Sequence, residues 1–227
     1  AGAIRVATRM IELNPEDPNN HYLRARFFEL SGNREKALAD YTKVIEISPA
    51  ASEALYNRAV LYFLLGRIAE SAADFDRFSE AQPTKLPTLW QRGIVLYYAG
   101  RFAEGRKQFE LHRTVNPNDV ENSVWHFLCV ARQENLEAAG KALFSGAGDP
   151  RVPMTEIYNL FAGKGTPAQV LARAEITTDN PGFLPLQRLY AHLYLALYHE
   201  VHGNEAKRRE HLQKAVETNL KNEYMWE

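Results

Sequence analysis

The sequence predicts an all-α protein built from repeated pairs of antiparallel helices. First, glycines recur every 34 residues, at Gly32, Gly66 and Gly100, and prolines keep the same interval, at Pro15, Pro49, Pro83 and Pro117. Second, small and aromatic residues recur in the same register. Third, the chain has 227 residues, of which 45% are hydrophobic and 24% charged, which is enough for a buried core and excludes disorder.

The recurring columns predict how each helix pair packs. The small columns are Ala25, Ala59 and Gly93, then Ala37, Ser71 and Gly105; the large ones are Phe28, Tyr62 and Leu96, then Tyr41, Phe75 and Phe109. Small residues let the first helix approach its partner, and the aromatic column fills the space opposite. The glycine is expected to end the first helix in a left-handed conformation, and the proline to end the second. Neighbouring pairs must stack, because one pair cannot bury its apolar face alone.

The period divides the first part of the chain into copies. Full copies span 18–51, 52–85 and 86–119, and 120–133 is the first helix of a fourth. Residues 1–17 form a partial copy that fits the second helix of a preceding pair. Either an upstream segment was removed or a lone helix caps that end. Glu134 stands where the next glycine belongs, so the register ends there.

The rest of the chain is predicted to be helical but less regular. In the irregular region 134–188 we expect a loop at 145–150, a short helix at 154–161 and a turn at 180–182. Thr166 and Gln169 form a capping box that opens a helix to about Ala174. The C-terminal part, 189–227, is expected to be a helix pair and tail, with helices from 186 to 201 and from 205 to 217 on either side of Gly203.

Three short motifs carry a family resemblance. They are Tyr22-Leu23-Arg24-Ala25, Tyr56-Asn57-Arg58-Ala59 and Trp90-Gln91-Arg92-Gly93. With them, residues 18–133 resemble tetratricopeptide (TPR) repeats, which implies a TPR α-solenoid. The whole layout is similar to the NlpI family of bacterial TPR lipoproteins, in the Trp-containing helix 122–128, the degenerate segment 157–161 and the closing pair around 193–198 and 214–216. The lipid-bearing N-terminal cysteine of that family is absent here.

The TPR resemblance implies that the first helix of each copy lines a concave groove. Its expected partner-binding residues are Tyr22, Arg26, Tyr56, Asn57, Phe63, Trp90, Gln91, Tyr97, Tyr98 and Trp125. Aromatic side chains with few charges suit a protein or peptide segment with apolar anchors. Two alternatives compete with this scaffold or adaptor role: residues 134–227 fold back into the groove, or a structural homodimer buries it.

Charge and hydropathy limit the partners. With 27 Lys and Arg against 28 Asp and Glu, the net charge of −1 favours neither nucleic acid nor anionic lipid. The longest apolar run is residues 59–65, so no transmembrane segment is expected. The NlpI resemblance implies an extracytoplasmic bacterial adaptor in the periplasm or envelope, as a homodimer; without that resemblance, the cytoplasm is the default.

No catalytic residue, cofactor or metal site is predicted. His199 and His202 are three residues apart, whereas a zinc peptidase needs a spacing of four. Together with His192 on the same helical face, they leave a histidine-based metal or enzymatic site in the C-terminal region as a further alternative. The segment 163–166 lacks the glycine and the strand of a phosphate loop. Cys129 is expected to be a core residue.

Overall fold

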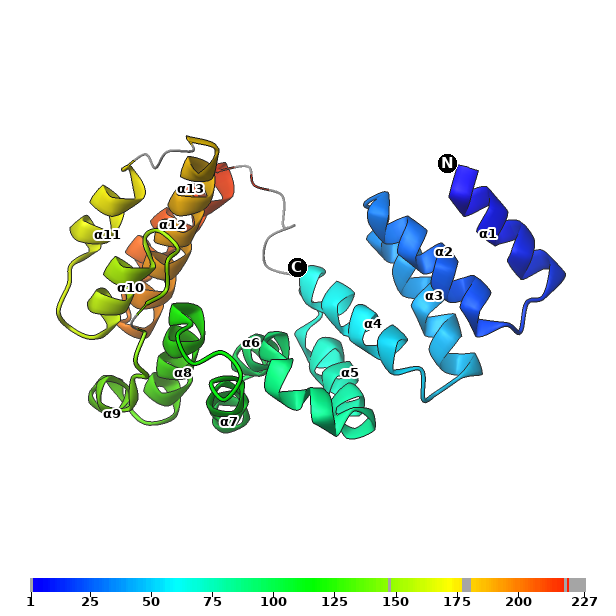
Figure 1. Ribbon diagram of the computed structural model, residues 1–227, viewed down its shortest axis with the longest axis horizontal. Helices are drawn as coiled ribbons and strands as arrows, with labels where there is room; N and C mark the ends of the chain where they lie inside the picture. The colour runs from blue at the N-terminus through cyan, green and yellow to red at the C-terminus, as the bar shows by residue number, and fades with distance from the viewer. Residues whose placement is uncertain (1, 147, 177–180, 219, 221–227) are drawn as a thin grey trace. The chain divides into compact units, whose positions relative to one another are not determined.

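The computed structural model describes residues 2–146, 148–176, 181–218 and 220, and these form helices and connections without a strand (Figure 1). The chain divides into two compact units, residues 1–101 and 102–227. The all-α fold that the repeat period predicts is therefore confirmed.

The first unit is a stack of antiparallel helices (Figure 1). It contains α1 (Gly2–Leu13), α2 (Pro18–Leu30), α3 (Arg34–Ile47), α4 (Ser52–Leu64), α5 (Ile68–Ala81), the 3-10 helix η1 (Pro83–Thr88) and α6 (Trp90–Tyr98). Helices α2 and α3 form one pair and α4 and α5 the next, and α3 also packs on α4. This is the stacking that an incomplete apolar face in each pair requires.

The glycines that follow α2, α4 and α6 have the predicted left-handed conformation. Gly32, Gly66 and Gly100 have φ angles of +73°, +72° and +74°. The residue after each glycine donates its backbone N–H to a carbonyl five residues earlier, as Arg67 does to Tyr62 at 2.8 Å. This hydrogen bond satisfies a terminal carbonyl of the first helix, and only glycine adopts the required φ without strain.

The core of the first unit includes residues of the predicted columns. Ala25, Ala59, Tyr41 and Phe75 have no exposed surface. Because the alanines leave room between the paired helices, the aromatic rings from the second helices fill it, and one continuous core runs through the repeats.

A ladder of partly buried ion pairs, absent from the sequence-based expectations, lies beside the same core. Arg24 donates from Nε and Nη2 to both carboxylate oxygens of Asp40, each at 2.7 Å, and Arg58 does so to Asp74 at 2.6 and 2.8 Å. Each arginine also reaches a threonine of the preceding second helix, in the second case Thr42 at 3.2 Å. The arginine thus connects its own pair to the one before.

Arg92, the third arginine of this column, pairs with a carboxylate at the position that threonine occupies in the earlier repeats. The residue 34 positions after Asp74 is Gln108, and the residue 34 positions after Thr42 is Asp76. Arg92 accordingly donates to Asp76 at 2.7 Å, and Arg101 donates to the other oxygen of that carboxylate at 2.6 Å. In this repeat the carboxylate stands at the threonine position and not at the position of Asp74, and the arginine binds it there.

The second unit begins with repeat-like helices and ends with a long helix pair. It contains α7 (Phe102–His112), α8 (Val120–Gln133), α9 (Leu136–Ala142), α10 (Met154–Phe161), α11 (Pro167–Ala174), η2 (Pro181–Phe183), α12 (Leu184–Val201) and α13 (Glu205–Glu217). The expected short helix, the capping box at Thr166 and the break at Gly203 are confirmed. The first residue of the expected turn at 180–182 lies outside the described residues.

The irregular region contains a helix that the sequence did not predict. Asn135 accepts a hydrogen bond from Ala138 N at 2.9 Å and so caps the seven-residue helix α9. The repeat glycine is missing, but the chain still turns and packs a short second helix on α8.

Arg151 fixes the loop after α9 to the start of α8. Its guanidinium contacts the carboxylates of Asp149, Asp119 and Glu121. Asp149 also accepts the backbone N–H of Val120 at 3.2 Å, at the N-terminus of α8. The loop therefore acts as part of the cap of this helix.

Candidate functional site

Two hydrogen bonds link the first helices of successive repeats. Asn57 Nδ2 on α4 donates to the hydroxyl of Tyr22 on α2 at 3.0 Å, and Gln91 Nε2 on α6 donates to the hydroxyl of Tyr56 at 2.8 Å. Each bond joins residues 35 positions apart, one repeat plus one residue. The structure thus brings together four of the expected groove residues as a tyrosine–amide ladder.

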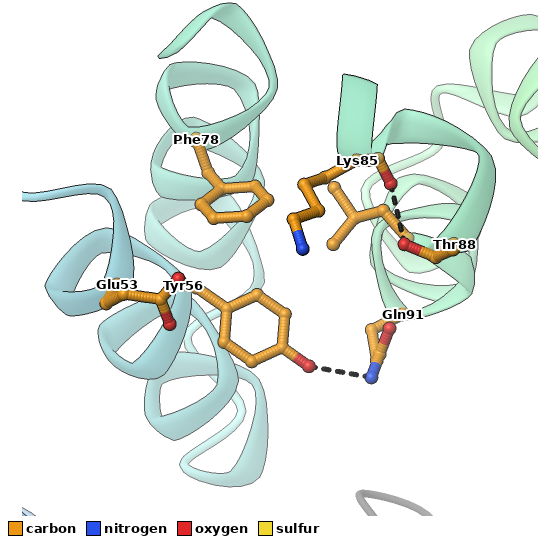
Figure 2. A pocket seen from close by; sticks show the side chains of 7 residues that line it. Glu53, Tyr56, Phe78, Lys85, Thr88 and Gln91 are labelled. Atoms are coloured by element: carbon orange, nitrogen blue, oxygen red, sulfur yellow. Dashed lines mark hydrogen bonds between the residues drawn. The ribbon is translucent and has the colours of Figure 1, made fainter. Parts of the chain in front are cut away.

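A pocket of about 220 Å³ lies beside the second bond of this ladder (Figure 2). It is formed where α4, the end of α5, η1 and the start of α6 meet. Its lining residues are Glu53, Tyr56, Phe78, Lys85, Thr88, Leu89 and Gln91. We call it the Tyr56 pocket.

The wall of the Tyr56 pocket is aromatic and has a neutral polar edge. The rings of Tyr56 and Phe78 have centroids 5.5 Å apart, and Leu89 is almost completely buried between the helices. Burial and the nearby Glu53 carboxylate raise the pKa of Tyr56, opposed by the Gln91 amide. The hydroxyl therefore stays protonated at neutral pH and can donate to a ligand while it accepts from Gln91.

Two charged residues of opposite sign lie at the rim. Figure 2 shows the Lys85 ammonium directed between Phe78 and Tyr56, with Glu53 on the opposite side, at the start of α4. Among the described residues neither of these two charges forms an ion pair. Both are therefore available to charged groups of a bound segment.

The expected groove residues outside this pocket have intramolecular contacts. Arg26 pairs with Glu29 at 3.0 Å, and the Tyr22 ring packs edge-on against Tyr41 at 5.6 Å. The Tyr41 hydroxyl donates to Glu29 as well, so Arg26, Glu29 and Tyr41 form one polar network.

The aromatic residues further along differ in exposure. Phe63 packs against Tyr98 with ring centroids 6.0 Å apart, and Tyr98 keeps 43% of its surface exposed. Tyr97 is only 3% exposed. Trp90 is half-buried at the start of α6. Trp125 belongs to the second unit, is 4% exposed and stacks on Phe109. The buried rings of Tyr97 and Trp125 serve packing and offer almost no surface to a partner.

Sequence reasoning missed the half of the pocket that comes from the second helix and from η1. Phe78, Lys85, Thr88 and Leu89 were not among the expected residues. The signal is the pair Pro83 and Pro87, because two prolines four positions apart cannot continue an ordinary α-helix and favour a short 3-10 segment.

Cys129 and the histidines of α12 are the side chains to which the sequence gives possible chemistry. Cys129 is completely buried, and burial raises the pKa of its thiol to about 12. His192 and His199 lie near His211 of the following helix. Within the part of the chain that the structure describes, no cluster of three or more His, Cys, Asp or Glu residues could hold a metal ion. None of the described helices is both long and apolar enough to span a bilayer.

Comparison with known proteins agrees with the repeat fold. Residues 31–85 match the tetratricopeptide repeat family, and no curated protein sequence matches the chain. The fold is a TPR α-solenoid, a class of helical-repeat folds.

Three solved structures show the same fold at low sequence identity. YrrB, described as a TPR protein with an unusual peptide-binding site, is 21% identical with a TM-score of 0.53, covering 98% of this chain and 96% of its own. A tetratricopeptide repeat protein from Parabacteroides merdae is 18% identical with a TM-score of 0.63, covering 98% and 88%. PilW, a type IV pilus biogenesis factor, is 16% identical with a TM-score of 0.53, covering 92% and 96%.

Proposed function

We propose that this chain is a non-catalytic scaffold that binds a protein or peptide segment through the Tyr56 pocket. The observation that carries the proposal is the contact between Tyr56 and Gln91, which joins two successive repeats at the edge of an aromatic pocket. Because both side chains are already fixed by this hydrogen bond, binding costs them little conformational entropy.

The size of the pocket favours an anchor side chain over a small molecule. Small-molecule sites usually enclose about 300–1,000 Å³, whereas this pocket encloses about 220 Å³. One large apolar side chain of an extended or helical segment fits such a space, and aromatic walls supply much of the binding energy at such contacts. Lys85 and Glu53 then select the charges on either side of the anchor.

The proposal includes an adaptor role of the kind that the NlpI resemblance implies. Such a protein would bring a partner to an enzyme in the bacterial envelope, and a second copy of the chain would present a second pocket. The competing possibility is that the pocket is filled by the chain itself or buried in a homodimer. Sedimentation equilibrium separates a dimer from a monomer, and peptide binding separates an open pocket from a filled one.

The test uses peptides selected from a random displayed library against the intact chain. The dissociation constant of a selected peptide is then measured by calorimetry for the wild type, for Tyr56→Ala and for Tyr62→Ala. Tyr62 lies on the same helix but packs against Arg67, so it controls for the loss of a tyrosine ring.

Tyr56→Ala should weaken binding about 30-fold, which corresponds to about 2 kcal/mol for an interface hot spot. Tyr62→Ala should bind like the wild type. Equal affinity of all three proteins, each with the wild-type circular dichroism spectrum, would place the binding site elsewhere.

A further inference from the structure

Helix α13 packs on the second unit through a histidine. Of its thirteen residues only His211 and Ala215 are buried. The facing helix α12 carries His192 and His199, seven residues apart and therefore on one side of the helix. A polar, titratable side chain thus occupies the position where most packed helices have a large apolar residue.

The three rings form one cluster at the interface of α12 and α13. His192 Nδ1 and His211 Nδ1 are 2.9 Å apart, and the rings of His199 and His211 stack with an interplanar angle of 12° and centroids 5.6 Å apart. We call these three residues the histidine cluster.

The short distance between the two Nδ1 atoms limits protonation. One Nδ1–H can donate to the other nitrogen only while that nitrogen has a free lone pair. If both rings become imidazolium, two donors and two positive charges face each other at this distance. The packed arrangement of the two helices therefore cannot hold His192 and His211 as imidazolium ions at the same time.

The charged groups around the cluster do not offset this repulsion. Lys207, Lys214 and His202 add positive charge. The carboxylates nearby already have partners: Glu175 pairs with Arg188 and Glu210 with Lys214, each at 2.7 Å, and Glu217 accepts from Gln213 at 3.1 Å.

Burial and the neighbouring positive charges both lower the pKa values of the three histidines. Burial, followed by the charges of His192 and His199, lowers the pKa of His211 to about 4. Burial, with Lys214 and Lys207 respectively, also lowers the pKa of His192 and of His199.

We propose that the histidine cluster is an acid-sensitive switch whose protonation releases α13 from α12. The released helix would expose the face of α12 that carries His192 and His199 and would leave the rest of the unit folded. This switch is independent of the Tyr56 pocket, and it can be correct or wrong whatever the pocket binds.

The size of the effect follows from proton linkage. A released histidine takes up its proton near its ordinary pKa of about 6.5, whereas the docked His211 does so at about 4. Near pH 7.5 both states are neutral and docking is at full strength. Near pH 5.5 only the released state is protonated, so the ratio of released to docked helix rises about tenfold for this one residue.

Hydrogen–deuterium exchange of the intact chain tests the proposal. After correction for the intrinsic pH dependence of exchange, the protection of α13 should fall at least about tenfold between pH ~7.5 and pH ~5.5. Protection of α8 and α10 should stay higher than that of α13 at both pH values, because release of α13 leaves them folded. The variant His211→Gln keeps a polar group but cannot titrate, so its α13 should lose the roughly tenfold part of the pH dependence that His211 contributes. His202→Gln removes an exposed histidine that adds positive charge near His199 but lies outside the cluster, so it should keep most of the wild-type pH dependence.

Two results would overturn the switch. One is equal protection of wild-type α13 at both pH values. The other, which applies even if His211→Gln fails to dock its helix, comes from titration of the wild-type imidazoles by NMR. Ordinary pKa values of about 6.5 or higher for both His192 and His211 would show that docking does not oppose protonation.

Discussion

Removing the charge of Asp74 should strongly destabilise the first unit. Its side chain is 5% exposed and that of Arg58 is 12% exposed, and two hydrogen bonds of 2.6 and 2.8 Å join them. In Asp74→Asn the largely buried guanidinium loses its hydrogen-bonded counter-charge. Breaking a buried ion pair in this way costs about 3–5 kcal/mol. Because Thr42 still contacts Arg58, we expect the lower end, about 3 kcal/mol.

The assay is the exchange protection of α4 and α5, which reports this unit directly. A loss of about 3 kcal/mol corresponds to a decrease in protection of roughly 100-fold. The matched control is Glu70→Gln in the same unit, since the pair of Glu70 with Arg67 is 45% exposed on both sides and should contribute nothing measurable. The double variant Arg58→Met/Asp74→Leu should recover most of the protection, because no unpaired charge stays buried. A decrease for Asp74→Asn no larger than that for the control would refute this reasoning.

Three further predictions concern single residues. Gly66→Val should cost at least about 1 kcal/mol in urea unfolding, because a β-branched residue is strained at a φ of +72°; an unchanged midpoint would contradict the turn assignment. Cys129 should not react with a thiol reagent in the native protein at neutral pH and should react once the chain is unfolded. Burial lowers the pKa of His126 to about 4, so the unfolded chain binds the extra proton and the stability of the second unit should fall as the pH drops from about 6.5 towards 4. His126→Gln should reduce that slope, measured by urea unfolding across this pH range.

The repeat fold could be predicted because the glycines and prolines that end its helices recur at a fixed interval in the sequence. Gly32, Gly66 and Gly100 each need a left-handed conformation, and this local requirement shows in the residue type alone. The pairing of Arg92 with Asp76, and not with position 108, was not predicted, although its cause is visible in the sequence. To see it, one must compare two columns of the repeat at once, the one that contains Asp74 and the one that contains Asp76.

The candidate site was only half predictable. Tyr56 and Gln91 lie in the repeat register. Lys85 and Thr88, which also line the pocket, belong to a 3-10 segment that interrupts this register. The histidine cluster was only partly predicted, for a related reason. The sequence places His192 and His199 on one face of a helix and His202 three residues further, but His202 contacts the backbone carbonyl of Tyr198, 2.7 Å away. The actual partner, on the antiparallel helix, is His211, whose proximity depends on tertiary packing.

The measurement that most directly tests the central claim is photo-crosslinking from inside the Tyr56 pocket. Thr88 lines the pocket, and Thr84 lies four residues earlier in η1, is exposed and does not line it. Each is replaced in turn by a photoreactive amino acid, and the chain is irradiated with a selected peptide at a concentration near its dissociation constant. We expect the Thr88 variant to crosslink the peptide, unlabelled peptide to compete, and the Thr84 variant to give no product. Binding of the peptide without a crosslink at Thr88, or with equal yields at both positions, would contradict the claim that the segment binds in this pocket.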